Sequence, residues 1–309
     1  PDTTVAVTFS APLASASPAP SLSPEVPGSW QRLTPSELLF TPSASFTPSA
    51  TYTVTVRGGA SGVRARRGPA LAASVASSFT VSPGSVLRLQ QLLAKLGYLP
   101  LTFAGATPSP AGMALAQPGA FAWRDGGFPA AFTSQWSPAH ATALTKGALL
   151  AFETQNGLEV DGTAGPAVWA ALFADVAAGK TDAEPLTYVL VDKTLPEHLT
   201  VWVNGVLTFA NVPCNTGVGG APTTDGTYEV FEHLQVSNMR GADVTGSTYD
   251  VTVPWASYFD GGEALHGYPR AAYGFPQSNG CVEMSISTAG RVWPDTPIGT
   301  LVTVAGPPA

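Results

Sequence analysis

Two residues near the C-terminal end of the chain carry side chains that can do nucleophilic chemistry together. Cys281 lies in the stretch FPQSNGCVEM, and His266 lies fifteen residues earlier in GGEALHGYP. A thiol is a strong nucleophile only as a thiolate, and a nearby imidazole can accept its proton and later return that proton to a leaving amine. Gly280 leaves room for a carbonyl beside the backbone, where N–H groups of a tight turn can stabilise an oxyanion. The pair predicts acyl transfer through a cysteine.

Other interpretations of Cys281 stay open at this stage. The second cysteine, Cys214, can form a disulfide with it in a secreted protein, which would remove the nucleophile. Alternatively Cys281 is a small buried apolar residue. We expect Cys214 to be buried on a strand. The histidines and cysteines show no zinc-type spacing, so no metal site is expected. The Gly-rich stretch GVGGAPTTDG lacks the Gly-Lys-Ser/Thr of a phosphate loop, and no cofactor is expected.

Composition and length limit the class of protein. A chain of 309 residues normally divides into several domains. Charged residues make up 11%, against roughly 25% in an average soluble protein, and 32 Gly and 29 Pro favour strands and turns. Residues 185–309 hold four basic and eleven acidic side chains. This acidity argues against a nucleic-acid partner, which needs clustered Lys and Arg.

The sequence has no run of 18 apolar residues, so no membrane span is expected. Its first residues lack the charged and apolar regions of a signal peptide.

Residues 1–82 read as short strands separated by Pro and Ser. TTVAVTFS and TYTVTVRG alternate apolar and polar residues, ELLFTP lies between them, and VASSFTV closes the series. Strands at this spacing, without a helical pattern, predict a small β-sandwich. The arrangement resembles bacterial Ig-like domains, with VTFSAPL near its start and SFTV at its end. The resemblance implies a spacer or adhesion module.

Residues 83–180 change to a helical period. In GSVLRLQQLLAKLGYLP, four leucines recur at i, i+3, i+4 and i+7, with Ser85 as N-cap and Gly97 as the C′ residue. TKGALLAFETQNG predicts a second helix, and Gly165-Pro166 opens a third. AFETQNGLEVDGTAGPAVWAAL resembles the repeat of bacterial peptidoglycan-binding domains. This resemblance implies a small three-helix bundle, here interrupted by an insert at about residues 101–145.

The insert is rich in aromatic side chains. A structureless loop of this length is improbable in a compact domain. The aromatics can either pack the insert onto its own domain, which we favour, or line a carbohydrate-binding surface. They are Phe103, Phe121, Trp123, Phe128, Phe132 and Trp136.

Residues 185–309 return to strand alternation and predict a mostly-β domain of catalytic size. TYVLVDKTLPEHLTVWVNGVLTF contains Asn204-Gly205, a strong hairpin signal. GTYEVFEHL, STYDVTVPWASYF and GTLVTVAG continue the β pattern. The whole chain is therefore expected to be multidomain, with boundaries near residues 82 and 180.

The C-terminal stretch ALHGYPRAAYGFPQSNGCVEM resembles the signature of L,D-transpeptidases with the YkuD-type fold. That signature is a His-Gly, a spacer, and then Ser/Thr-His-Gly-Cys followed by an apolar residue and usually Arg. The resemblance extends over residues 186–304, including NTGVGGAPTTDGTYEV and TPIGTLVTV. It implies an extracytoplasmic enzyme in which Cys281 attacks a peptidoglycan stem peptide and releases D-alanine. An amine of a second stem then closes a 3→3 cross-link. Carbapenem β-lactams are the inhibitors the resemblance implies.

The resemblance also implies roles for single residues. His266 is the general base and later acid, and Ser278 orients the imidazole through its carbonyl. Backbone N–H groups near Gly280 form the oxyanion hole, with Asn279 beside it. The residues expected to contact substrate are Trp255, Tyr258, His233 and Gly267.

Two positions depart from the family's pattern. Asn279 replaces the second histidine of the signature and can donate a hydrogen bond but not carry a proton. Glu283 replaces the arginine, and an anion near the thiol would raise the pKa of Cys281. The alternatives are therefore a peptidoglycan-binding scaffold with a weak or inactive transpeptidase fold, an L,D-carboxypeptidase that uses water as acceptor, and another hydrolase or amidotransferase.

Overall fold

The computed structural model describes residues 4–182 and 184–306, and these residues fall into two compact units. One unit contains the described part of residues 1–89 together with residues 105–119 and 164–174. The other contains residues 90–104, 120–163 and the described part of residues 175–309. No helix in the described part of the chain is long and apolar enough to cross a membrane.

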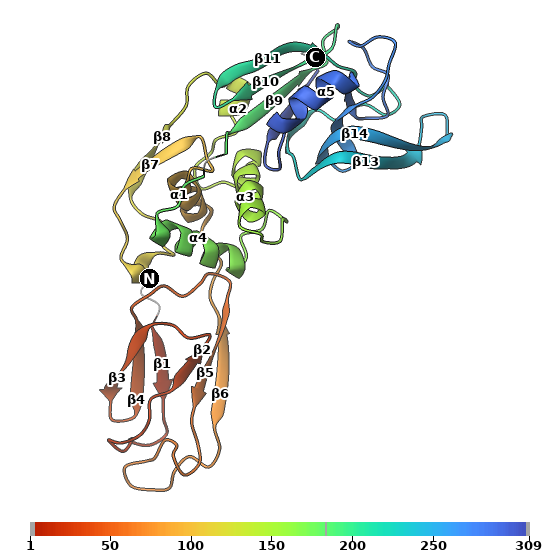
Figure 1. Cartoon of the computed structure of the whole chain (residues 1–309). Helices are drawn as coiled ribbons and strands as arrows, with labels where there is room; N and C mark the ends of the chain where they lie inside the picture. Colours follow the sequence, from red (N-terminus) through yellow and green to blue (C-terminus); the bar gives the residue numbers. More distant parts are fainter. Residues whose placement is uncertain (1–3, 183, 307–309) are drawn as a thin grey trace. The chain divides into compact units, whose positions relative to one another are not determined.

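The first unit begins with a β-sandwich (Figure 1). One sheet has the order β1-β4-β3 and the other the order β2-β5-β6, with antiparallel neighbours. Val5 and Val7 are half-buried while Ala6 and Thr8 are exposed, so the predicted alternation and the sandwich are confirmed. The strands are β1 (Val5–Thr8), β2 (Ser21–Ser23), β3 (Gly28–Thr34), β4 (Glu37–Pro42), β5 (Thr51–Val56) and β6 (Val75–Thr80).

Helices form at the three predicted places, as α1 (Val86–Leu96), α3 (Ala143–Gln155) and α4 (Pro166–Ala178). The Ser85 hydroxyl accepts the Arg88 N–H at 3.2 Å, which confirms the N-cap. Gly97 has φ +93°, and the Tyr98 N–H donates to the carbonyl of Leu93, the geometry of a glycine-terminated helix. A separate three-helix bundle is not confirmed, because α3 belongs to the same compact unit as the C-terminal strands.

The insert has secondary structure of its own: β7 (Leu101–Gly105), a 3₁₀ turn η1 (Pro110–Gly112), β8 (Gly119–Trp123) and the short helix α2 (Ala130–Thr133). β7 pairs with β8. The Phe132 ring is fully buried, with its centroid 4.2 Å from that of Phe128 and 5.1 Å from that of Tyr188 on the first C-terminal strand. Packing, the favoured interpretation of the insert's aromatics, is therefore confirmed for Phe132.

The C-terminal strands form two sheets of the second unit. One has the order β11-β10-β9-β17-β12, and the other has the order β13-β14-β15-β16. Pairing is antiparallel except between β9 and β17 and between β15 and β16. The elements are β9 (Thr187–Asp192), β10 (His198–Val203), β11 (Val206–Pro213), β12 (Gly226–Glu229), β13 (Glu232–Ala242), β14 (Thr248–Asp260), β15 (Glu263–Gly267), β16 (Val282–Met284), α5 (Ile286–Val292), η2 (Trp293–Asp295) and β17 (Leu301–Ala305).

One apolar core joins these two sheets. Val189 and Val201 from the first sheet and Leu265 and Val282 from the second are each at most 1% exposed in one cluster. Asn204 at φ +49° and Gly205 at φ +75° form the predicted two-residue turn between β10 and β11. β13 and β14 form a long hairpin that extends from the second sheet (Figure 1). The mostly-β prediction is thus confirmed.

Helix α3 lies against the same sheets. A Cβ atom on Gly147 would lie 2.5 Å from the carbonyl oxygen of Gly299, just before β17, so only glycine fits there. Lys146 pairs with Glu229 on β12. The backbone of α3 therefore contacts the C-terminal strands directly.

Candidate active site

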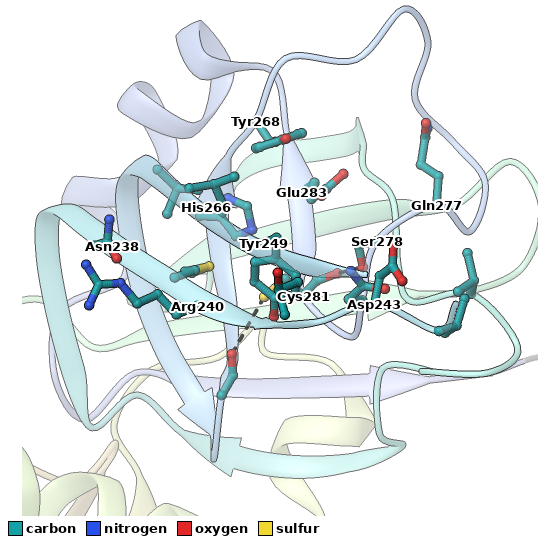
Figure 2. A pocket seen from close by; sticks show the side chains of 18 of the residues that line it. Asn238, Arg240, Asp243, Tyr249, His266, Tyr268, Gln277, Ser278, Cys281 and Glu283 are labelled. Carbon is teal, nitrogen blue, oxygen red and sulfur yellow. Dashed lines mark hydrogen bonds between the residues drawn. The ribbon is translucent and has the colours of Figure 1, made fainter. Parts of the chain in front are cut away.

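The two residues expected to do chemistry lie on neighbouring strands. β15 and β16 run parallel, with His266 opposite Glu283 in the register. Cys281 directly precedes β16 and lies two residues before Glu283, so the alternation of side chains places the imidazole and the thiol on the same face of the sheet. Both residues line one cavity of about 610 Å³. Figure 2 shows them with Ser278 around this cavity.

The cavity is built by three parts of the domain. β15 and the residues around Cys281 form one wall, the β13–β14 hairpin forms a second, and the loop between His266 and Cys281 forms the third. The hairpin contributes polar side chains, of which Asn238, Arg240, Asp243 and Tyr249 are labelled in Figure 2. Ser247 and Thr248 also line the cavity. The cavity is therefore large enough and polar enough for a short peptide segment.

The imidazole of His266 is oriented by its own strand. His266 is 3% exposed, and its Nδ1 lies 3.1 Å from the carbonyl oxygen of Gly267. A carbonyl only accepts, so Nδ1 donates and the lone pair of the neutral ring lies on Nε2. Burial lowers the pKa of His266, while the neighbouring carboxylate of Glu283 opposes that shift. At neutral pH the ring is a neutral base with Nε2 available.

The thiol of Cys281 is also neutral at rest. Its Sγ lies 3.7 Å from the carbonyl oxygen of Gly262. Burial raises the pKa of the thiol to about 11, with further increases from Glu283 and Glu263 and an opposing hydrogen bond from the backbone of Ala264. A neutral thiol and a neutral imidazole that line one cavity can transfer a proton as the thiol attacks a carbonyl, without a preformed ion pair.

The turn before the thiol is held open to the cavity. Gly280 has φ +106°, a conformation that favours glycine. Its carbonyl accepts a hydrogen bond from the hydroxyl of Thr223 at 2.7 Å, and the Ser278 hydroxyl donates to the Cys281 carbonyl at 2.6 Å. Within residues 4–182 and 184–306, the backbone N–H groups of residues 279–281 have no hydrogen-bond acceptor. Three donors around one turn suit an oxyanion.

Glu283 has a cationic partner that the motif comparison did not reveal. Arg270 donates from Nε to one carboxylate oxygen and from Nη2 to the other, each at 2.8 Å. The carboxylate is 6% exposed at its side chain and the guanidinium 29%. Arg270 thus balances the negative charge of Glu283, which lines the same cavity as the thiol.

Comparison with known proteins agrees with this geometry. Residues 186–304 match the family described as the L,D-transpeptidase catalytic domain, YkuD. This part of the chain is an L,D-transpeptidase catalytic domain. Residues 1–81 match the family described as the bacterial Ig-like domain. The chain has no match among curated protein sequences. The helical segment between the two matched domains belongs to neither match, so peptidoglycan binding by it stays a prediction.

Solved structures with distant similarity include three L,D-transpeptidases. One from Mycobacterium smegmatis is 13% identical with a TM-score of 0.36, over 98% of this chain and 91% of that one. L,D-transpeptidase 3 from Mycobacterium tuberculosis is 14% identical with a TM-score of 0.36, over 98% and 91%. The catalytic domain from the E. faecium enzyme is 21% identical with a TM-score of 0.35, over 40% and 100%.

One expected contact inside the transpeptidase domain is different. Ser278 was expected to orient the imidazole through its carbonyl, but this carbonyl accepts the Val218 N–H at 3.0 Å. The ring of His266 is held by Gly267 instead. The Ser278 carbonyl takes this partner because an isolated parallel β-bridge joins Gly217 and Ser278 beside the turn. Ser278 acts on the turn through its hydroxyl.

The expected substrate residues divide into two groups. Tyr258 and Asn279 line the cavity of the transpeptidase domain, and the Tyr258 hydroxyl lies 2.7 Å from that of Ser237. Trp255 and Gly267 do not line it: the Trp255 ring lies 5.4 Å from that of Trp293, and Gly267 packs against the start of α5.

His233 also lies away from Cys281. Its ring stacks on Trp293 with centroids 3.9 Å apart, and it lines a different cavity, between α3 and the segment before β17. The β pattern placed His233 on the correct strand, but it did not reveal which sheet face borders the cavity.

Cys214 is a free, fully buried thiol, and Cys281 is also free. The expected burial of Cys214 is confirmed. Residues that sequence reasoning missed include Thr223 and Arg270. A signal for Arg270 existed, because a glutamate in the apolar strand CVEM requires a cation, and residues 185–309 contain only four.

Proposed function

We propose that this protein is a cell-wall L,D-transpeptidase that works outside the cytoplasm through a Cys281 acyl-enzyme. The observation that carries the proposal is one cavity lined by the imidazole of His266 on β15 and by the thiol of Cys281 directly before β16, with three N–H groups that have no partner among the described residues. The match to the L,D-transpeptidase catalytic domain supports the same chemistry. Peptidoglycan stem peptides are the proposed substrates.

The first half-reaction forms a thioester. Sγ of Cys281 attacks the carbonyl that links the diamino acid at stem position three to the terminal D-alanine, while Nε2 of His266 accepts the thiol proton. The tetrahedral oxyanion accepts hydrogen bonds from the N–H groups of residues 279–281. The C–N bond then breaks, and the imidazolium gives its proton to the amine of the departing D-alanine.

The second half-reaction regenerates the thiol. The side-chain amine of a second stem attacks the thioester, loses a proton to His266 and forms the new amide, while the C–S bond breaks and Cys281 takes the proton back. The product is a 3→3 cross-link. With water in place of the amine, the same residues produce a carboxylic acid, which is the L,D-carboxypeptidase alternative.

The substitution at Asn279 does not remove any group that these steps use. The base is His266, and Asn279 lines the cavity with its amide available as a donor. The paired state of Glu283 also weakens the argument for the inactive scaffold, since its carboxylate is neutralised by Arg270. The helices α3 and α4 are proposed to bind peptidoglycan on the strength of their sequence resemblance.

The test is the intact mass of the protein after exposure to imipenem or ertapenem. Solved structures describe an L,D-transpeptidase in complex with imipenem and an E. faecium catalytic domain acylated by ertapenem. We expect one covalent adduct, lost in Cys281→Ala and retained in the control Cys214→Ala. An adduct that persists in Cys281→Ala, or a wild-type protein without an adduct, would refute the nucleophile. Incubation with disaccharide tetrapeptide then separates cross-linked dimer from tripeptide, the hydrolytic product.

A further inference from the structure

The carboxylate of Glu283 is a buried anion fixed beside the proposed nucleophile. Glu283 is 5% exposed, and its backbone N–H and carbonyl both bond to Asn215 at 2.9 Å. His266 is its register partner on β15. These backbone contacts fix the face of the sheet from which the Glu283 side chain projects. A buried carboxylate of this kind needs a partner charge, because its desolvation is otherwise uncompensated.

The guanidinium of Arg270 supplies this positive charge. It also bonds within the loop of residues 268–277 to which Arg270 belongs. Besides its two bonds to Glu283, Nη2 donates to the carbonyl of Gln277 at 3.0 Å. The guanidinium carbon lies 4.7 Å from the ring centroid of Tyr268, a cation–π distance. At the base of the loop, the Tyr273 hydroxyl accepts the Arg270 N–H and donates to the Tyr268 carbonyl. One side chain thus ties both ends of the loop to β16.

We propose that Arg270 is a positioning residue for the Cys281 site, which clamps residues 268–277 onto Glu283 and cancels the charge of that carboxylate beside the thiol. The loop ends one residue before Ser278, where the turn that presents the nucleophile begins. Fixing Gln277 therefore fixes the start of that turn. The inference rests on the proposed function only in taking Cys281 as the nucleophile.

The charges around Cys281 and His266 show how the loss of Arg270 would change their reactivity. Two carboxylates act on the thiol, Glu283 from β16 and Glu263 from β15. On the imidazole of His266, Glu283 favours the protonated ring and Arg270 opposes it. Without Arg270, the full charge of Glu283 would disfavour the thiolate and favour the imidazolium, which cannot act as a base. Both changes slow attack by sulfur.

The test is the rate at which iodoacetamide alkylates Cys281 in Arg270→Met, followed by peptide mass spectrometry at several pH values. We expect alkylation about tenfold slower at the same pH, equivalent to an upward shift of about one pKa unit. Arg270→Met combined with Glu283→Gln should recover most of the rate, because the uncompensated charge is gone. The alkylation rate of Arg270→Lys should lie between those of the wild type and Arg270→Met, since lysine keeps the positive charge but lacks the planar guanidinium. The matched control is Arg124→Met, an arginine of similar exposure paired with Asp125.

Wild-type alkylation kinetics in folded Arg270→Met would overturn the proposal. A double variant as slow as the single one would overturn it too, since loop closure without charge compensation would then explain everything. If Arg270→Met does not fold, Glu283→Gln alone decides, because it should alkylate faster than wild type. Alkylation needs no carbapenem, so a missing carbapenem adduct in the wild type refutes the proposed function and leaves this measurement intact.

Discussion

Replacement of Thr223 by Val removes a single hydroxyl from below the turn that presents Cys281. Thr223 is 1% exposed, and its Oγ1 donates to the Gly280 carbonyl at 2.7 Å and accepts the Gly217 N–H at 2.9 Å. Valine has nearly the same shape, so no cavity forms. Two buried backbone groups lose their partner at about 1–3 kcal/mol each, and we expect the free energy of unfolding to fall by about 2–6 kcal/mol.

The same change should slow acylation. The Thr223 hydroxyl donates to the Gly280 carbonyl and so fixes the peptide plane between Gly280 and Cys281. In a trans peptide the Cys281 N–H then points away from this hydroxyl. Loss of one complete oxyanion donor costs about 10²–10³ in rate, and a misaligned donor should cost about tenfold to a hundredfold. The assay is the time course of carbapenem adduct formation by intact mass, beside urea unfolding.

Thr187→Val is the matched control. Its hydroxyl lies 2.5 Å from that of Thr300, both residues are buried, and neither lines the Cys281 cavity. We expect a comparable loss of stability with an unchanged acylation rate. Wild-type acylation by folded Thr223→Val, or an equal rate loss in Thr187→Val, would refute the reasoning.

Two further predictions concern stability. Burial lowers the pKa of His233 from 6.5 to about 4, so the unfolded chain binds a proton first, and the free energy of unfolding should fall as pH drops from about 6.5 toward 4. Urea unfolding at pH 6.5 and at pH 4 measures this decrease, which should be smaller in His233→Phe than in the wild type. An equal decrease in both proteins would contradict the lowered pKa of His233. Phe132→Ala should lower the free energy of unfolding by about 3–5 kcal/mol, because the ring is fully buried between the insert and Tyr188. The control is Phe231→Ala, because Phe231 is 38% exposed, and it should lower the free energy of unfolding far less. An equal decrease in the two variants would argue against packing of the insert.

Much of the fold was predictable because its signals are local. The alternation around Val5 and Val7 and the Asn204-Gly205 turn report interactions between residues a few positions apart. The caps at Ser85 and Gly97 are of the same kind. The three predicted helices formed for this reason. Their separation into an independent bundle is not confirmed, and a glycine such as Gly147 gives no sequence signal that a distant backbone lies against it.

The sequence by itself determined the chemistry available to this protein: one thiol after a glycine, one histidine at a fitting distance, and strands to hold them. Only the tertiary structure decided which groups act on them. Thr223 bonds to Gly280, 57 positions further along the chain, and Arg270 bonds to Glu283, 13 positions further along. Strand register and sheet pairing set these contacts, and both depend on the packing of the whole core.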